Sequence, residues 1–497
     1  MIRKALLLMC ALALPFNVWG RVGELVICDD VVDPSSLDPQ KQFSEKNHTI
    51  CHQIFDGLLR FDNDGRIEPA LAVSWRRLDP LKVEFKLRKG VRFHNGEPFN
   101  AASVKFTIDR YLDPKTGFPA LAFISTIDRV DIIDDETVVI VTKFPDGLLL
   151  NRLAGFVVIV PPGYLGKVGE AKFATHPVGT GAFKFVSWEA GKSITLERNP
   201  AYWMPGYPKA EVLTFRFIPT KHQLEELYAG RVDILTELPG TATMAVAKNP
   251  GTAVVKKESF YTLAANFNLT RGPLRDRRVR QALNFAVDRD ELIRYDLMGN
   301  GRPLATFSMP GEEGFNPDLR PYPYDLARAT KLLKEAGYGK GFKLKAFVKS
   351  TGERAARIIK VQWKKVGVDL DYEIKNEGDF ISQIKSADLD LAFGGSPDPM
   401  AHVFFIQSIS LYSRSPYSIV NSPEYDRGLV EMASTLDDET RVQLAKKLDQ
   451  YIYDEAFGVF TYQRTKIYGV RRGVDFIPSV TGMPSLYSAQ PAARLQP

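Results

Sequence analysis

Two glycine-containing segments have the residue types of phosphate and nucleotide sites. The segment GKS at residues 191–193 matches the end of the phosphate loop G-x-x-x-x-G-K-S, in which backbone amides and a lysine cradle phosphates. Val186 stands where its first glycine is needed, which excludes this loop. The segment GTG at residues 179–181 could open a dinucleotide fingerprint, but Lys184 replaces the third glycine and a strand-like alternation follows it.

Nucleophilic and metal chemistry have equally incomplete patterns. A nucleophile elbow, G-x-S-x-G, would place Ser396 as the nucleophile, but Asp398 occupies the position of the second glycine. No histidine is followed by glutamate, so the zinc motif H-E-x-x-H is absent. His48, Cys51 and His52 share one helical face and could bind a metal, but no fourth ligand is evident, so a partly buried helix face is favoured. The residues predict a protein without a catalytic site.

The elements that would position these residues alternate between strands and helices. Residues 177–203 predict a β-hairpin, because two alternating stretches flank the reversal at Ala190-Gly191. A strand, a helix and a strand at 343–348, 353–366 and 368–374 predict a parallel crossover and therefore an α/β domain. Further strands are expected at 24–28, 83–88, 137–143 and 231–235, and helices at 47–59, after Asn100, at 221–229, around 279–286, after Asp325, at 400–405 and at 438–453.

Composition indicates an exported protein of several domains. The 497 residues exceed what one core usually organises, and 44% apolar with 25% charged residues is ordinary for a globular chain. Residues 1–20 have the basic start, short apolar run and small-residue end of a signal peptide, with cleavage expected after Gly20. Removal of residues 1–20, which contain Arg3 and Lys4, lowers the net charge from +6 to +4, which is too dilute to predict nucleic-acid binding. Cys28 and Cys51 remain after cleavage, and they either form a disulfide, which is slightly favoured, or lie apart as buried thiols.

Four stretches, in order along the chain, resemble the family 5 extracellular solute-binding proteins, the peptide and nickel receptors of ABC importers. They are QIFDGLLRFDNDGRIEPALAVSW at 53–75, LRKGVRFHNGEPFNAASVKFTIDR at 87–110, the hairpin segment at 177–203, and DRRVRQALNFAVDR at 276–289. The resemblance covers nearly the whole chain after residue 20, and the ordered set of matches makes it specific.

This resemblance implies an α/β fold of the periplasmic-binding-protein type II-like class, with two lobes, a hinge and an inserted extra domain. Lobe I is expected at 21–57, 175–265 and 475–497, the inserted domain at 58–174, and lobe II at 266–474. The hinge crossings are expected near Asn266 and Val474. The implied protein is a periplasmic monomer without a cofactor or enzymatic activity. It captures a peptide or similar small solute and passes it to inner-membrane ABC permease subunits.

The resemblance also suggests where a ligand binds. Peptide receptors of this family usually hold the α-ammonium of the ligand with an aspartate in the loop that corresponds to residues 393–402. Here Gly395 or Ser396 occupies that position, so either Asp398 takes the role or the ligand is another solute, such as a modified peptide or an opine-like compound. Asp398 also suits a helix cap. The expected ligand-binding residues are Asn266, Asn268, Phe393, Gly395, Ser396, Asp398 and Tyr462.

Two other functions stay open at this stage. His48 and His52 leave room for a receptor of a metal or metallophore, with nickel or haem as the ligand. An exported hydrolase of unfamiliar type is the less favoured alternative.

Overall fold

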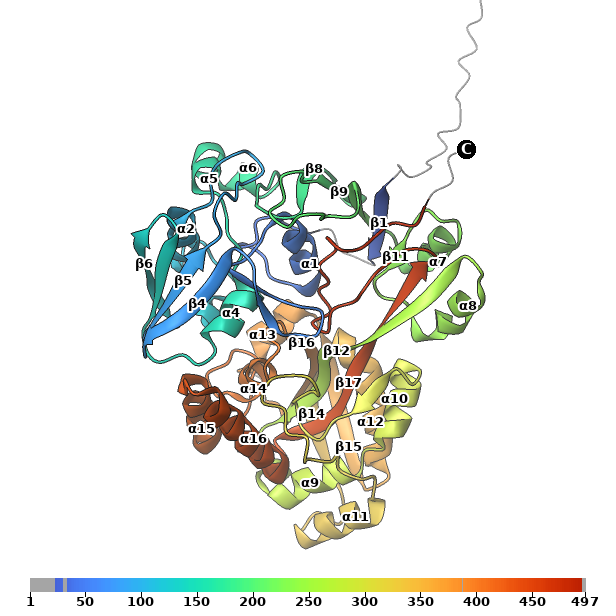
Figure 1. Ribbon diagram of the computed structural model, residues 1–497. Coiled ribbons are helices and arrows are strands. Elements are labelled where there is room, and N and C mark those ends of the chain that lie inside the picture. The colour runs from blue at the N-terminus through green and yellow to red at the C-terminus, as the bar shows by residue number, and fades with distance from the viewer. Residues whose placement is uncertain (1–22, 30–33, 387, 494–497) are drawn as a thin grey trace, which may run out of the picture.

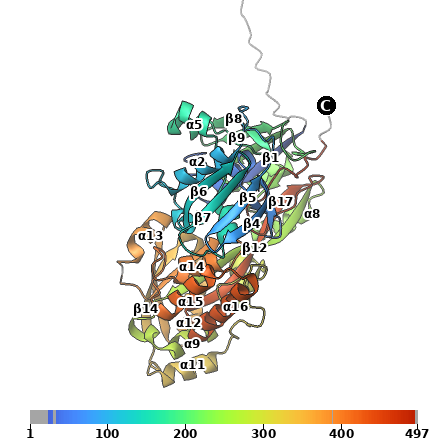
Figure 2. The same cartoon turned by 60° about the vertical axis from the view of Figure 1, so that its left-hand side comes forward.

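The computed structural model describes residues 23–29, 34–386 and 388–493. The predicted signal peptide, residues 1–20, therefore lies outside the described residues. Two lobes lie one above the other, with a smaller sheet-and-helix unit beside the upper lobe (Figure 1). A view turned by 60° shows the same separation, with the smaller unit in front (Figure 2).

One mixed sheet of 11 strands runs through both lobes. Its spatial order is β15 (Val368–Lys375), β14 (Phe342–Lys349), β16 (Leu391–Pro397), β12 (Thr252–Phe267), β17 (Gly458–Arg471), β11 (Ile234–Leu235), β1 (Glu24–Asp29), β10 (Val212–Phe217), β9 (Ser193–Arg198) and β8 (Phe183–Glu189), with β13 (Gly301–Pro303) paired to β17.

The long antiparallel strands β12 and β17 connect the two lobes. In the upper lobe β17 also pairs with β11, and in the lower lobe β12 also pairs with β16. The register between β12 and β17 shifts between Glu258 and Thr262. Asn266 already pairs with Gly458 and Ala392 inside the lower lobe, so the strands change lobe before the expected crossing at Asn266. Val474 lies beyond the upper end of β17, so the second expected crossing is also displaced.

The upper lobe confirms the predicted hairpin. β8 and β9 pair antiparallel with Phe183 opposite Arg198, and Gly191 in their turn has φ +71°, a conformation that favours glycine. β1 pairs in parallel with both β10 and β11. The helices of this lobe are α1 (Glu45–Ile54), α7 (Thr220–Tyr228) and α8 (Thr243–Lys248).

The lower lobe confirms the predicted parallel crossover. β14 and β15 pair in parallel, and α12 (Glu353–Lys364) connects them with Trp363 completely buried. The other helices are α9 (Arg277–Phe285), α10 (Arg289–Leu297), α11 (Leu326–Glu335), α13 (Glu377–Ile384), α14 (Phe404–Leu411), α15 (Pro423–Ser434) and α16 (Asp438–Glu455). Asp276 and Asp325 cap α9 and α11 by accepting hydrogen bonds from backbone amides.

Residues 59–173 build the smaller unit beside the upper lobe. Its four-stranded sheet has the order β4 (Ala72–Asp79), β5 (Lys82–Leu87), β7 (Thr137–Thr142) and β6 (Ile127–Asp134). A two-stranded ribbon, β2 (Leu59–Phe61) and β3 (Ile67–Pro69), precedes it. The helices are α2 (Ala101–Leu112), α3 (Leu121–Ile124), α4 (Leu149–Phe156), α5 (Pro162–Val168) and α6 (Glu170–Phe173). Asn100 caps α2, as predicted.

Two predicted helices differ from the observed ones. The helix expected at 47–59 begins after Ser44, which caps it, and ends at Ile54, because the chain then becomes extended at Phe55. Gly57 does not end a helix: a Cβ atom there would lie 2.6 Å from the carbonyl oxygen of Val157, so the glycine permits close chain packing. The helix expected at 400–405 begins only at Phe404.

The smaller unit shares a continuous apolar core with the lower lobe. Phe123 and Phe156 stack 5.1 Å apart, and Phe405 of α14 packs 4.8 Å from Phe123. The side chain of Asn151 donates a hydrogen bond of 3.0 Å to the carbonyl oxygen of Met400. The lower lobe is therefore held against this unit as well as against the strands it shares with the upper lobe.

The predicted disulfide is wrong. Cys28 and Cys51 are buried thiols on opposite sides of β1, in separate apolar clusters. The thiol of Cys51 lies 3.8 Å from the carbonyl oxygen of Leu37. Burial raises the pKa of the Cys51 thiol well above its usual value, which disfavours the reactive thiolate.

Among the described helices, none has the length and apolar character needed to cross a membrane.

Candidate functional site

A pocket opens where β12, β14 and β16 meet α13 and α14 in the lower lobe. β14 and β16 are parallel, so their carboxyl ends lie at the same edge of the sheet, a common ligand position in α/β folds. The lining residues are Thr262, Ala264, Asn266, Phe307, Lys349, Phe380, Ala392, Gly394, Gly395, Ser396, Ile406, Ile409, Ser410 and Tyr417.

Two consecutive glycines leave space that other side chains fill. A Cβ atom on Gly394 would lie 2.8 Å from Cδ of Lys349, so the lysine stem runs over this glycine. A Cβ atom on Gly395 would lie 2.1 Å from the hydroxyl oxygen of Tyr261. The glycine pair therefore permits the placement of both a lysine and a tyrosine beside the pocket.

Lys349 is the charged side chain of this lining, and its ammonium group lies between two rings. Its Nζ is 5.1 Å from the ring centre of Phe380 and 5.3 Å from that of Tyr417. It also forms an ion pair of 2.9 Å with Glu377, at the start of α13. Burial, followed by the Glu377 charge, raises the pKa of the Tyr417 phenol, so this hydroxyl stays protonated and can donate.

A second pocket lies in the upper lobe between β1, α1 and β17. Lys466 contacts Glu45 and lies 3.4 Å from Glu237, and Glu237 also pairs with Arg464. Burial alone would raise the pKa of Glu237, but the two cations hold it below its usual value. The hydroxyl of Tyr468 lines this pocket without a hydrogen-bond partner in the described part of the chain. β17 thus carries a neutralised charge cluster close to the junction of the lobes.

Some of the predicted ligand-binding residues line the first pocket, and others lie away from it. Asn266, Gly395 and Ser396 line the first pocket. Phe393 points into the apolar core instead. Asn268 follows β12 and donates a hydrogen bond to the carbonyl oxygen of Leu389, outside the pocket.

Tyr462 and Asp398 are also away from the pocket surface. Tyr462 is buried and hydrogen-bonds to Asp296. Asp398 has no exposed surface, and its two carboxylate oxygens accept hydrogen bonds from the backbone amides of Met400 and His402, at 2.7 and 2.9 Å. It therefore fixes the turn that leads to α14.

Asp398 belongs to a buried acidic group under this turn. Burial raises the pKa of Asp398 to about 7. Glu312 is also buried, with 5% of its surface exposed. Burial first, and then the neighbouring Asp398 carboxylate, raise its pKa well above the usual value. Glu312 accepts a hydrogen bond of 2.6 Å from the backbone amide of Met309, and its other oxygen has no partner among the described residues.

The two histidines of α1 stack on each other, with ring centres 3.7 Å apart and planes tilted by 31°. Ring nitrogens bind metals through lone pairs in the ring plane, so two stacked rings direct these lone pairs side by side rather than toward one point. Burial lowers the pKa of His48 and His52, which keeps both rings neutral near pH 7. Within the described ranges, no group of three or more His, Cys, Asp or Glu residues could hold a metal ion.

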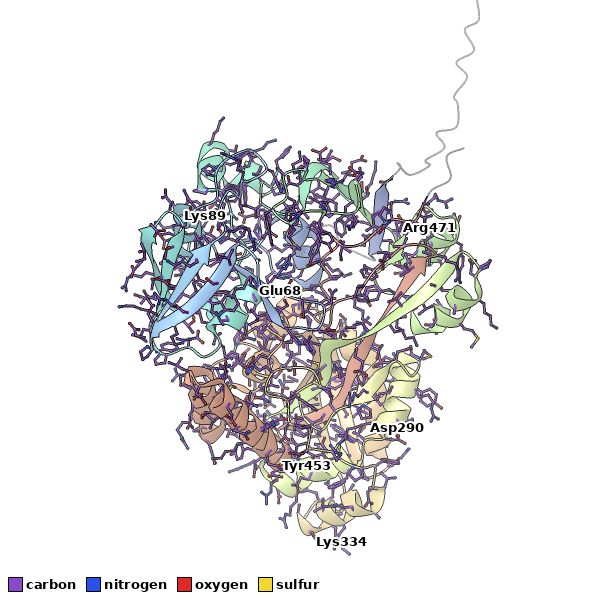
Figure 3. The ribbon with its side chains drawn as sticks, viewed as in Figure 1. Glu68, Lys89, Asp290, Lys334, Tyr453 and Arg471 are labelled. Carbon is purple, nitrogen blue, oxygen red and sulfur yellow. The ribbon has the colours of Figure 1, made fainter. Side chains whose placement is uncertain are left out.

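Several residues of the two pockets were missed by the sequence analysis. Lys349 directly follows the strand predicted at 343–348, so its position at the end of a parallel strand was an available signal. Tyr261 and Lys466 had no local signal, because they pair with residues distant in the sequence. Glu237 follows β11 and meets Arg464 and Lys466 only in the folded chain. β17 extends from the lower lobe to the upper lobe. In Figure 3, Tyr453, which shortly precedes the strand, lies in the lower lobe, and Arg471 lies at the upper end of the strand.

Comparison with known proteins gives a consistent result. The description "Bacterial extracellular solute-binding proteins, family 5 Middle" matches residues 66–414. The glutathione-binding protein GsiB of Pectobacterium atrosepticum is 28% identical over 443 residues, which cover 86% of each chain.

Solved structures have the same fold. The periplasmic binding protein DppA of Helicobacter pylori, in complex with peptide STSA, has a TM-score of 0.81 at 24% identity, covering 95% of this chain and 98% of that one. The binding protein AgaA of A. tumefaciens R10, in complex with agropinic acid, has a TM-score of 0.79 at 26% identity, covering 94% and 98%. These similarities confirm the predicted two-lobe, type II-like binding-protein fold. The chain belongs to the family 5 bacterial extracellular solute-binding proteins.

Proposed function

We propose that this protein is the receptor of an ABC importer, which captures a peptide or a related small solute in the periplasm and delivers it to an inner-membrane permease. The observation that carries the proposal is the position of the first pocket. It opens beside β12, one of the two strands that belong to both lobes. A solute bound there is placed where a change in the angle between the lobes alters the pocket.

The relatives support this class of ligand. GsiB proteins are named for glutathione, DppA of H. pylori was solved with a peptide, and AgaA was solved with agropinic acid. Export would remove residues 1–20 by cleavage after Gly20. We expect a monomer that binds its ligand without converting it.

We further propose that the two lobes move as separate bodies, with residues 58–174 as the inserted domain, and that the lobe boundaries expected at 265/266 and 474/475 lie instead within the shared strands β12 and β17. The register shift between Glu258 and Thr262 is the best place for the first hinge. The facing residues 463–465 of β17 provide the second, because their pairing partners change at the same level. Closure is expected to bring the charge cluster around Glu237 toward the first pocket.

Within that pocket, Asn266, Gly395 and Ser396 are proposed as ligand contacts, because they line it. Asn268, Phe393, Asp398 and Tyr462 are proposed to support the site from behind, since each is occupied by contacts with the protein.

Native mass spectrometry of freshly purified protein tests the proposal, because a receptor that closes over its ligand tends to retain it. The expected result is one small solute per chain, released by partial unfolding. The variant Ile409→Trp, which fills the first pocket, should lose the solute, and Val361→Trp on the exposed side of α12 should keep it.

An amine-release assay with mixed di- to pentapeptides separates binding from turnover. Product in excess of the protein concentration would contradict the receptor function. Small-angle scattering should show a smaller radius of gyration when a ligand is bound, because closure brings the lobes together.

A further inference from the structure

We propose that the first pocket takes the acidic group of its solute, with Lys349 as the charge partner, and disfavours a free ammonium group. The proposal rests on the proposed receptor function and adds the chemical class of the ligand. It predicts solutes with a carboxylate and a blocked or absent amine, such as acylated amino acids and N-blocked peptides.

The charge of the lining is the first observation. Of the described residues that form it, Lys349 alone carries a charge, and no aspartate or glutamate is among them. The other polar groups are neutral hydroxyl and amide side chains from Thr262, Asn266, Ser396, Ser410 and Tyr417. Such groups can donate hydrogen bonds to a carboxylate, but none of them supplies a negative charge for an ammonium group.

The position of Lys349 is the second observation. Its side chain is 16% exposed, so most of the side chain is shielded from water. The rings of Phe380 and Tyr417 replace part of that hydration through cation–π attraction. An incoming carboxylate would add a charge-assisted hydrogen bond in a partly dry site, where such bonds are strong.

Glu377 pairs with Lys349 too weakly to exclude a ligand carboxylate as a second partner. Its side chain is 59% exposed, and an ion pair with one exposed partner contributes little free energy because solvent screens it. Glu377 is the first residue of α13 and is not among the residues that line the pocket. A ligand carboxylate can therefore share Lys349 with Glu377 or replace it without leaving a buried charge unpaired.

The segment at residues 394–396 offers no carboxylate to a ligand ammonium group. Gly395 has no side chain, and the hydroxyl group of Tyr261 occupies the space in which one would begin. The nearest carboxylate along this segment, Asp398, is completely buried and holds two backbone amides. An ammonium group placed against residues 394–396 would lose its hydration without gaining a countercharge.

The apolar part of the lining completes the ligand class. Phe307, Ile406 and Ile409 supply apolar surface to the pocket. An acid with a small apolar body, such as an acyl chain or an aliphatic side chain, matches this combination of one cation, neutral donors and apolar contacts.

Matched pairs of probes test the proposal by isothermal titration calorimetry. Each pair contains an N-acetylated dipeptide as its free acid and as its C-terminal amide; the unblocked dipeptide and glutathione complete the set. The native protein should bind the acids at least tenfold more tightly than the amides. The affinity for the acids should also fall between 50 and 300 mM salt, because salt screens the charge pair between the ligand carboxylate and Lys349. The affinity for the amides should not change.

Variants identify the cation. Lys349→Met keeps the aliphatic stem over Gly394 and should abolish the preference for acids. Lys343→Met, at an exposed position on the same strand, is the control and should leave the preference unchanged. Glu377→Gln removes the competing carboxylate and should tighten acid binding several-fold.

The outcomes distinguish this proposal from the receptor function on which it rests. Amides that bind as tightly as acids, or an acid preference that survives in Lys349→Met, would overturn the proposal and leave the receptor function intact. Binding of the unblocked dipeptide in preference to its acetylated form would overturn it too. If no probe binds and the purified protein retains no solute, the receptor function itself fails.

Discussion

Replacing Glu312 by glutamine should make the protein more resistant to unfolding as the pH rises. Glu312 is buried beneath the turn at residues 398–402, where burial and the Asp398 carboxylate raise its pKa well above the usual value. In the unfolded chain, Glu312 should lose its proton near the ordinary glutamate pKa of about 4.3. The folded protein keeps that proton to a higher pH. Its contribution to stability is complete below that pH and is lost as the pH rises toward the folded pKa.

The magnitude follows from the single proton. While Glu312 stays protonated in the folded state, each pH unit above the unfolded pKa lowers the unfolding free energy by about 1.4 kcal/mol. Glutamine has nearly the same shape, has no titrating proton, and can accept the hydrogen bond that Glu312 receives from the Met309 amide. The unfolding free energy of Glu312→Gln, relative to that of the native protein, should therefore rise by about 1.4 kcal/mol between pH 5 and pH 6.

Urea unfolding followed by tryptophan fluorescence measures this difference, because Trp363 is completely buried in the same lobe. Glu335→Gln, on the exposed side of α11, is the matched control and should show no such slope. A constant difference between Glu312→Gln and the native protein from pH 5 to pH 8 would refute the reasoning. It would mean that Glu312 ionises like a hydrated carboxylate.

Two substitutions and one titration test other features. Arg152→Met should destabilise the protein by about 3–5 kcal/mol, because it leaves the buried Asp146 carboxylate, now 3.0 Å from the guanidinium group, without a countercharge; the added change Asp146→Asn should restore part of the loss in the same urea assay. Gly395→Ala should lower the melting temperature and the affinity for acids, because its methyl group would overlap the Tyr261 hydroxyl, whereas Gly166→Ala, with open space around it, should be neutral or stabilising. Thiol titration of denatured, unreduced protein should find both cysteines of the upper lobe reactive, and a disulfide would appear as two missing thiols.

Local patterns predicted the elements that local contacts specify. The hairpin at β8 and β9 and the crossover through α12 follow from alternation, turn residues and apolar spacing, and the structure has both. The helix cap at Asn100 was also predictable, because its side chain accepts a hydrogen bond from the backbone amide of Ser103, only three residues away. The family resemblance supplied the two-lobe arrangement that these elements alone leave undetermined.

What could not be predicted depends on contacts between distant parts of the chain. The sequence showed that glycines 394 and 395 lie in a segment where the family usually has an acidic residue. It did not show that Lys349 of β14 and Tyr261 of β12 fill the space beside them. Asp398 suited a cap, and its carboxylate does accept backbone hydrogen bonds, but its complete burial depends on packing in the lower lobe. The cysteines are close in sequence, yet β1 separates them, because its two faces pack in different clusters.

The place of β17 in the sheet sets the order in which this protein can be completed during its synthesis. It is the last strand to be made, but it lies between β12 and β11, in the middle of the sheet. Until residues 458–471 have emerged, β12 and β11 each lack one of their two pairing partners, and both lobes retain an open strand edge. In a chain that is translocated amino terminus first, the fold can therefore close only after nearly the whole length has passed. Truncated products that lack β17 would keep both edges open to pairing with other chains.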